Sequence, residues 1–135
     1  MYTEKCGHNF ILTYDFDQIK TEDYIKLFSP GGESTEYLRL TPHILDIMRN
    51  FFKKNQPRAA IYHGPQILKT AQVVQEKKLT TYLTVKPEVK VTGGQFVEVA
   101  LKNTVTNGTL ITVPAWATHP KLMCEFLQLL GLSFP

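Results

Sequence analysis

Three segments of the chain carry apolar residues at helical spacing, and each begins with a proline that suits the first helical turn. The first follows Thr41-Pro42, where threonine is a common N-cap residue, the second begins at Pro65, and the third runs from Pro120 to Gly131. Glycine after the last apolar position is a frequent helix stop. The pattern therefore predicts three amphipathic helices, each with one face packed on a core.

Short runs between and before these helices are rich in β-branched and aromatic residues, which is typical of strands. The predicted strands cover residues 10–14, 24–28, 59–62, 79–85, 95–105 and 110–113. Asn107-Gly108, between the last two runs, is a preferred pair for a type I′ hairpin because both residues tolerate positive φ. Strands that alternate with helices predict an α/β fold: a three-layer αβα sandwich with a mainly parallel, flavodoxin-like sheet and an antiparallel hairpin.

The composition predicts one folded domain over residues 1–135, because 43% of the residues are hydrophobic and 20% are charged. The net charge of +3 comes from 15 basic and 12 acidic residues, which are scattered apart from the pairs Lys53-Lys54 and Lys77-Lys78. We therefore expect no nucleic-acid partner. No apolar run approaches the roughly 18 residues that a membrane span needs, so we expect no membrane partner either.

The cysteine and histidine positions predict neither a disulfide framework nor a metal site. Two cysteines, Cys6 and Cys124, and no signal-peptide pattern favour a reducing, cytoplasmic setting. Cys124 is expected to pack as a small hydrophobe on the last helix, whereas the basic neighbours of Cys6 favour a reactive thiol. His8, His43 and His119 have no partner at a metal-ligand spacing, so we predict no metal and no cofactor.

The segment from Ala60 to Pro65 runs from a predicted buried strand directly into a predicted helix. Its Gly64 allows close backbone approach, and its proline presets the first helical φ, which together are typical of a nucleophile elbow. In such an elbow, one strained residue projects its side chain over exposed backbone N–H groups that stabilise an oxyanion. Tyr62 occupies that position, and His63 follows it.

This elbow, the Pro30-Gly31-Gly32 turn and the closing segment 114–120 together resemble the ThiJ/PfpI superfamily, whose members are related to class I glutamine amidotransferases. The superfamily includes the Parkinsonism-associated deglycase, glyoxalase III enzymes and PfpI-type intracellular peptidases. The resemblance implies that Tyr62 stands where the family places its nucleophilic cysteine, and that His63 aligns with the general base. It also implies that Glu36 aligns with an acid that, in PfpI-type oligomers, orients a histidine of the neighbouring subunit.

The resemblance also assigns roles to the glycines and implies a missing segment. Gly31, Gly32 and Gly64 align with backbone that faces the reactive site. Family domains usually begin with a strand, a helix and a second strand, which would precede Met1, so the domain is expected to be N-terminally incomplete. The absent segment usually supplies a carboxylate to the elbow cysteine, and its loss would leave the strand at 24–28 with an unpaired edge. We therefore expect a homo-oligomer.

The tyrosine argues against covalent catalysis. At neutral pH a free thiol is a few per cent ionised, whereas a phenol with a pKa near 10 is only about 0.1% ionised. Help from a helix dipole amounts to about 0.3–1 kcal/mol, which does not close that gap. We therefore predict a non-catalytic ThiJ/PfpI-like domain that acts through self-association or partner contacts.

Other interpretations of the same residues remain open. One is a glyoxalase III, deglycase or PfpI-type hydrolase that uses His63 and Glu36 as acid and base on a small-molecule aldehyde. Another is a small-molecule or anion-binding module at the Pro30-Gly31-Gly32 turn. His63 can also serve only to hydrogen-bond the elbow, and Glu36 only as a first-turn helix acid.

Overall fold

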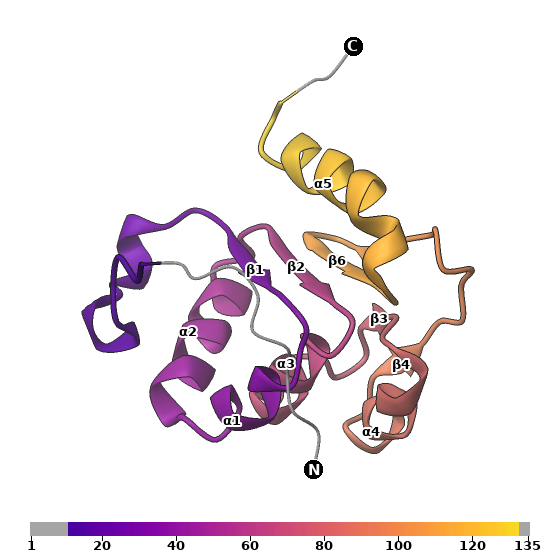
Figure 1. Ribbon diagram of the computed structural model, residues 1–135, viewed down its shortest axis with the longest axis horizontal. Coiled ribbons are helices and arrows are strands. Elements are labelled where there is room, and N and C mark those ends of the chain that lie inside the picture. The colour runs from indigo at the N-terminus through magenta and orange to yellow at the C-terminus, as the bar shows by residue number, and fades with distance from the viewer. Residues whose placement is uncertain (1–10, 133–135) are drawn as a thin grey trace.

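The computed structural model of the chain describes residues 11–132, which form helices, strands and short 3₁₀ turns (Figure 1). The helices are α1 (Ser34–Leu38), α2 (Pro42–Lys53), α3 (Pro65–Thr70), α4 (Lys86–Val91) and α5 (His119–Gln128). The strands are β1 (Leu27–Ser29), β2 (Arg58–Ile61), β3 (Lys78–Leu79), β4 (Gln95–Phe96), β5 (Val105–Asn107) and β6 (Leu110–Val113). Four 3₁₀ turns, η1 to η4, cover Phe16–Gln18, Thr21–Asp23, Leu83–Val85 and Trp116–Thr118.

The main sheet has four strands in the order β1-β2-β6-β5. β1, β2 and β6 are parallel, with Ala60 opposite Ser29 on one side and Thr112 on the other, and β5 joins β6 as an antiparallel edge. Every residue of β2 and β6 is buried, as expected for parallel strands covered on both faces. β3 and β4 form a separate parallel pair.

Helices cover both faces of this sheet (Figure 1). On one face, Ala60 and Leu110 pack in a core cluster with buried residues of α2, α3 and α4. On the other face, Ile61 and Val113 pack against Leu122 and Phe126 of α5. Neighbouring residues of one strand thus face opposite cores, which is the two-residue period of a strand. The predicted three-layer α/β sandwich with a mainly parallel sheet is confirmed.

The three predicted helices are present, with their predicted signals. α2 begins with Pro42 after the N-cap residue Thr41, and α3 begins at Pro65. α5 begins one residue before Pro120, and Gly131 beyond its end has a φ of 78°. These starts follow from proline geometry, which local sequence alone determines.

Four predicted strands were wrong or too long. Residues 11–14 form no strand, and Phe10, which the prediction included, lies outside the described residues. Of segment 79–85, only Leu79 lies in a strand. Segment 24–28 is strand only at residues 27–28, and segment 95–105 is strand at its two ends, in β4 and at Val105, but not between them. Near Leu79, the backbone N–H of Thr80 donates to the hydroxyl of Thr112 at 2.9 Å, so a side chain replaces a ladder partner. The helix α4, which starts at Lys86-Pro87, was not predicted.

The hairpin is confirmed, but its turn is displaced by one residue. Asn107 pairs with Leu110 in the ladder, so Gly108 and Thr109 form the two-residue loop. Gly108 has a φ of 61°, and neither Asn107 nor Thr109 has a positive φ. A type I′ turn needs positive φ at both loop residues, so this turn is of another type.

Cys124 is exposed on α5, so the prediction that it packs as a small hydrophobe was wrong, and Cys6 lies outside the described residues. Lys53 lies in the last turn of α2, where a cation favours the helix dipole. Within residues 11–132, no helix is both long and apolar enough to cross a bilayer.

Packing of α5 against the sheet yields a stability prediction. Leu122 is 0% exposed and its neighbour Met123 is 41% exposed, so the two side chains form a matched pair on one helix. We expect Leu122→Ala to lower the free energy of unfolding by about 2–5 kcal/mol because it leaves a cavity between α5 and the sheet. Met123→Ala should lower it by less than about 1 kcal/mol. Urea unfolding followed by circular dichroism measures both, and equal losses would contradict the assigned packing.

Candidate functional site

The elbow lies between β2 and α3, at the carboxyl end of a central strand. Tyr62, the first residue after β2, has a φ of 60°, in the left-handed region that non-glycine residues rarely adopt. The tight turn is closed by Gly64 N–H donating to the carbonyl of Ile61 at 2.7 Å. Tyr62 N–H donates to Val113, and Tyr62 accepts from Tyr82 N–H, so the strained residue is tied on both sides. The strand–turn–helix layout predicted for residues 60–65 is present.

Two glycines around Tyr62 are required by close packing and not by their φ angles. A Cβ at Gly31 would lie 2.8 Å from Tyr62 Cβ, and one at Gly64 would lie 2.9 Å from the carbonyl oxygen of Ile61 and still closer to that of Ser29. A Cβ atom essentially never lies within 3.0 Å of another such heavy atom, so a larger residue at either position would force the neighbouring atoms to move. Gly32 differs, because its φ of 96° is itself unsuited to a side chain.

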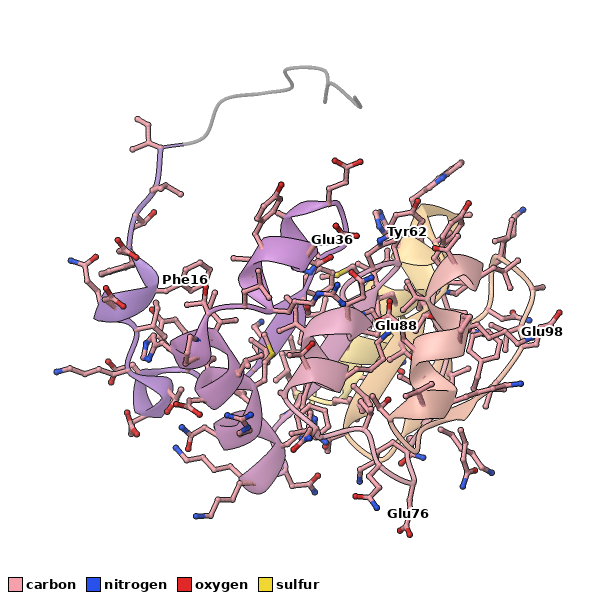
Figure 2. The ribbon with its side chains drawn as sticks, turned by 90° about the horizontal axis from the view of Figure 1, so that it is seen from below. Phe16, Glu36, Tyr62, Glu76, Glu88 and Glu98 are labelled. Carbon is pink, nitrogen blue, oxygen red and sulfur yellow. The ribbon has the colours of Figure 1, made fainter. Side chains whose placement is uncertain are left out.

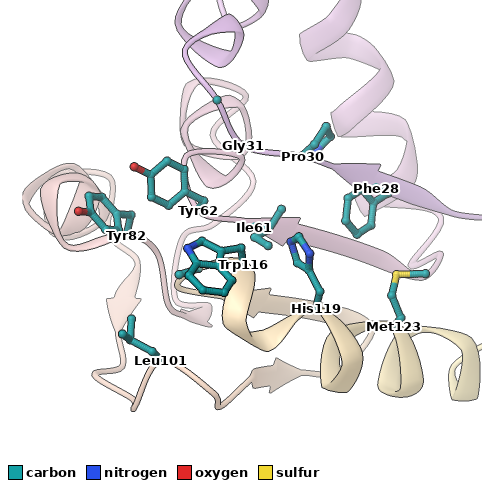
Figure 3. A pocket seen from close by; sticks show the side chains of 12 residues that line it. Phe28, Pro30, Gly31, Ile61, Tyr62, Tyr82, Leu101, Trp116, His119 and Met123 are labelled. Carbon is teal, nitrogen blue, oxygen red and sulfur yellow. The ribbon is translucent and has the colours of Figure 1, made fainter. Parts of the chain in front are cut away.

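The ring of Tyr62 belongs to an aromatic cluster. Its centroid lies 4.2 Å from that of His63 and 4.4 Å from that of Tyr82, and Figure 3 shows the two tyrosines side by side. Such separations are typical of favourable aromatic pairs. The residue at the elbow therefore presents a packed ring where a nucleophile's small side chain would stand.

A cavity of about 600 Å³ opens beside the elbow. Its walls come from the 30–32 turn, from Ile61, Tyr62 and Tyr82, and from the segment that leads into α5 (Figure 3). The lining residues are Phe28, Pro30, Gly31, Gly32, Ile61, Tyr62, Tyr82, Leu101, Ala115, Trp116, His119 and Met123. No Asp, Glu, Lys or Arg is among these described residues, so the cavity is apolar with a few polar edges.

The structure brings some of the predicted site residues together and leaves Glu36 apart. Gly31 and Gly32 line the cavity with Tyr62, while Gly64 lies behind it under the turn. Within residues 11–132, the buried Nδ1 atom of His63 has no hydrogen-bond partner. Glu36 is exposed on α1, and no hydrogen bond or ion pair joins it to His63 in the described part of the chain (Figure 2). The acid–base roles of His63 and Glu36 stay predictions.

The other described histidines, His43 and His119, lie in different parts of the fold. His43 Nε2 lies 2.8 Å from the carbonyl oxygen of Phe16, which links α2 to η1, and His119 lines the cavity. His8 lies outside the described residues. Across residues 11–132, no three side chains of the metal-binding types gather at one point.

Polar contacts hold the helix that follows the elbow. The side chain of Lys69 on α3 is 2% exposed, and its ammonium group donates to Glu88 on α4 at 2.7 Å. The guanidinium group of Arg39 lies 3.4 Å from the same carboxylate. The hydroxyl of Thr35 on α1 donates to Gln66 on α3 at 3.0 Å. These contacts hold α3 against α1 and α4, and α3 is the helix into which the elbow leads.

Several of these residues were not predicted as parts of the site. Tyr82 was assigned to a strand, and Trp116 served only as part of a family-like segment. Neither residue is near Tyr62 in sequence, and only the tertiary fold places them at one cavity. The one available signal was Trp116 itself, because it is the single tryptophan of the chain and follows a predicted strand end.

A strained elbow at the end of a central parallel strand, with close glycines around it, defines an α/β protein of the nucleophile-elbow class. The chain matches the DJ-1/PfpI family over residues 1–129 and therefore belongs to it. It is 40% identical over 133 residues to "Protein DJ-1 homolog D" of Arabidopsis thaliana, covering 98% of this chain and 34% of that protein. It is 30% identical over 132 residues to "Deglycase PfpI" of Pyrococcus furiosus, covering 95% of this chain and 75% of that protein.

Solved structures share the fold. A ThiJ/PfpI domain protein from Brachyspira murdochii superposes with a TM-score of 0.77 at 18% identity, covering 87% of this chain and 67% of that one. A two-domain protein from Anabaena variabilis with DJ-1/ThiJ/PfpI-like and ferritin-like domains gives a TM-score of 0.81 at 21% identity, covering 86% of this chain and 32% of that one. The chain spans about a third of the length of its plant relatives and three quarters of the Pyrococcus protein.

The contact between Lys69 and Glu88 yields a pH prediction. Burial by itself raises the pKa of Glu88, but the hydrogen bond and charge of Lys69, with the charge of Arg39, outweigh it and lower that pKa below 4.5. A lowered pKa in the folded state makes the carboxylate stabilising above pH 4.5, and this contribution is lost as pH falls through the folded pKa. Glu88→Gln should therefore cost about 1–2 kcal/mol at pH 7, discounted because the Glu88 side chain is 44% exposed, and progressively less as the pH falls below 4.5 toward the lowered pKa of the folded state.

The control is Glu98→Gln, which removes a carboxylate from a more exposed pair with Lys86. Urea unfolding between pH 7 and pH 3 measures all three proteins. We expect the Glu98 variant to follow the wild type throughout, because exposed ion pairs contribute little. A Glu88 variant as stable as the wild type at pH 7, or one whose deficit grows as the pH falls below 4.5, would show that the ionised pair does not hold α3.

Proposed function

We propose that the chain is a non-catalytic DJ-1/PfpI domain that acts by binding, through self-association or contacts with a partner. The observation that carries this proposal is Tyr62 at the elbow, with a φ of 60° and a ring packed against His63 and Tyr82. A phenol is a far weaker nucleophile than a thiol near neutral pH. The ring also occupies space that a covalent adduct on a smaller side chain would need.

The surroundings of His63 support the same proposal. A general base of this kind needs a group that fixes its tautomer and stabilises its charged form. Within the described residues, His63 Nδ1 has no such partner, and its nearest aromatic neighbours are the rings of Tyr62 and Tyr82. One chain therefore provides neither a thiol at the elbow nor an acid–histidine pair in residues 11–132.

Self-association is supported by the edge of the main sheet. β1 pairs with β2 only, so among the described strands its other side carries no partner. Leu27 N–H donates to Pro57 on the β2 side, so by strand alternation Phe28 N–H points toward the open edge. An open edge with exposed apolar neighbours such as Ile25 is a surface on which a second strand can add.

Enzymatic assays test the absence of catalysis. With methylglyoxal or a glycated amino acid as substrate, the wild type should show the same background rate as His63→Ala, because the elbow carries Tyr62 and no thiol to capture the carbonyl. "Deglycase PfpI" of Pyrococcus furiosus serves as the positive control for the glycated substrate. Turnover by the wild type well above background, abolished in His63→Ala, would overturn the proposal.

The oligomeric state tests the edge of β1. We expect the wild type to sediment as a dimer or larger species at high concentration, and Phe28→Pro to shift it at least tenfold toward monomer by removing the outward N–H. Phe28→Ala is the matched control, because it removes the same ring and keeps the donor. A monomeric wild type, or equal effects of the two variants, would contradict strand addition at this edge.

A second candidate is an enzyme that uses His63 and Glu36 for proton transfer without a thiol, acting on a small aldehyde. It is favoured by the position of His63 directly after the strained elbow residue and by the deglycase names of relatives such as the Pyrococcus protein. In this case Glu36 would have to reach His63 of another subunit. Parallel loss of activity in His63→Ala and Glu36→Gln, with Glu33→Gln unaffected, would support the enzyme; activity indifferent to both would exclude it.

A further inference from the structure

The cavity beside the elbow has the dimensions of a small-molecule site. Its volume of about 600 Å³ falls in the range of about 300–1,000 Å³ that is usual for such sites. A two- or three-carbon aldehyde would fill only a small part of it. The size therefore points to a larger ligand than the substrates considered above.

Four aromatic side chains contribute to the wall: Phe28 lies at one end, and Tyr62, Tyr82 and Trp116 lie toward the other (Figure 3). Trp116 is 76% exposed, which is unusual for so large an apolar ring. Its backbone is nevertheless well anchored, because the buried Thr118 donates through its hydroxyl to Leu101 and through its N–H to Ala115 at 3.2 Å. The indole of Trp116 is therefore exposed at the rim on a fixed backbone, where a planar ligand can stack on it.

The rest of the lining restricts the charge of that partner. No carboxylate, ammonium or guanidinium group is among the described lining residues, so an ionised ligand would lose hydration without a compensating ion pair. The polar groups present are the tyrosine hydroxyls, His119 and the backbone of the 30–32 turn. Phe28 and Met123 make the opposite end apolar.

We propose that this cavity binds an uncharged, planar aromatic molecule of about two fused rings, stacked on Trp116 and edged by Tyr62 and Tyr82. The inference rests on the proposed function in one respect, since a ligand held at an elbow without a thiol is released unchanged. Tyr62 then has a role that a smaller side chain would not fill, because its ring forms part of the wall.

The lone tryptophan makes the site directly observable. With one tryptophan in the chain, the ¹⁵N-labelled protein gives one indole N–H resonance, and that resonance comes from the cavity rim. The probe is 2-naphthol, with decahydro-2-naphthol as its saturated, non-planar counterpart and 2-naphthoate as its anionic one. We expect 2-naphthol to shift the resonance saturably, and calorimetry to give at least tenfold weaker binding for the other two.

Variants locate the site. Trp116→Ala and Tyr62→Ala should each weaken 2-naphthol binding at least tenfold in calorimetry, and Trp116→Phe should retain most of the affinity. Tyr37→Ala is the matched control, because Tyr37 is 75% exposed, as Trp116 is, but lies on α1 and does not line the cavity. Urea unfolding of each variant separates loss of binding from loss of fold.

The outcomes distinguish this inference from the function on which it rests. Absence of 2-naphthol binding, equal binding of the saturated compound, or unchanged affinity in Trp116→Ala would overturn the inference and leave the non-catalytic proposal standing. Binding at the cavity followed by conversion of the probe to a new product would overturn the non-catalytic proposal and leave the aromatic site standing. If the aromatic site and the non-catalytic proposal both hold, 2-naphthol binds and is recovered unchanged.

Discussion

The site depends on one backbone constraint, the left-handed conformation of Tyr62 between β2 and α3. A conformation of this kind costs about 1–3 kcal/mol and persists only when surrounding contacts fix it. Here β6 fixes it through Val113, Tyr82 fixes it through its N–H, and Gly31 and Gly64 leave room for it. The cavity follows from the same bend, because the bend directs the Tyr62 side chain away from the sheet and toward the segment that leads into α5.

The shape of the elbow and its chemistry are separable in this protein. The shape is set by backbone hydrogen bonds and by the close packing of Gly64 against backbone carbonyls, neither of which involves the side chain at position 62. The chemistry depends on that side chain and on an acid for His63, and residues 11–132 supply neither the thiol nor the acid at hydrogen-bond distance. The fold and the sequence match show membership of the DJ-1/PfpI family, whereas the loss of activity is a proposal that rests on Tyr62 and on the surroundings of His63.

The sequence predicted the helices and the elbow better than the strands, for physical reasons. Proline and glycine fix φ locally, so Pro42, Pro65 and Gly131 marked helix ends without help from the fold. The strand propensity of segment 79–85 was overridden, because a hydroxyl of Thr112 took the place of a ladder partner and Lys86-Pro87 began a helix. The elbow could be predicted because its residues, including Tyr62 and His63, are adjacent in the sequence. Trp116, Tyr82 and the contact of Lys69 with Glu88 depend on segments that meet only in the folded chain.

The left-handed backbone at position 62 also restricts which mutations the gene can accept there. β-Branched residues are poorly suited to positive φ, since their side chain crowds the following carbonyl, and proline is excluded because its ring fixes a negative φ. A glycine would relieve the strain and remove the ring that packs against His63 and Tyr82. A change from cysteine to tyrosine needs a single nucleotide substitution in the second codon position. One such substitution would therefore separate this aromatic elbow from an elbow that carries a thiol.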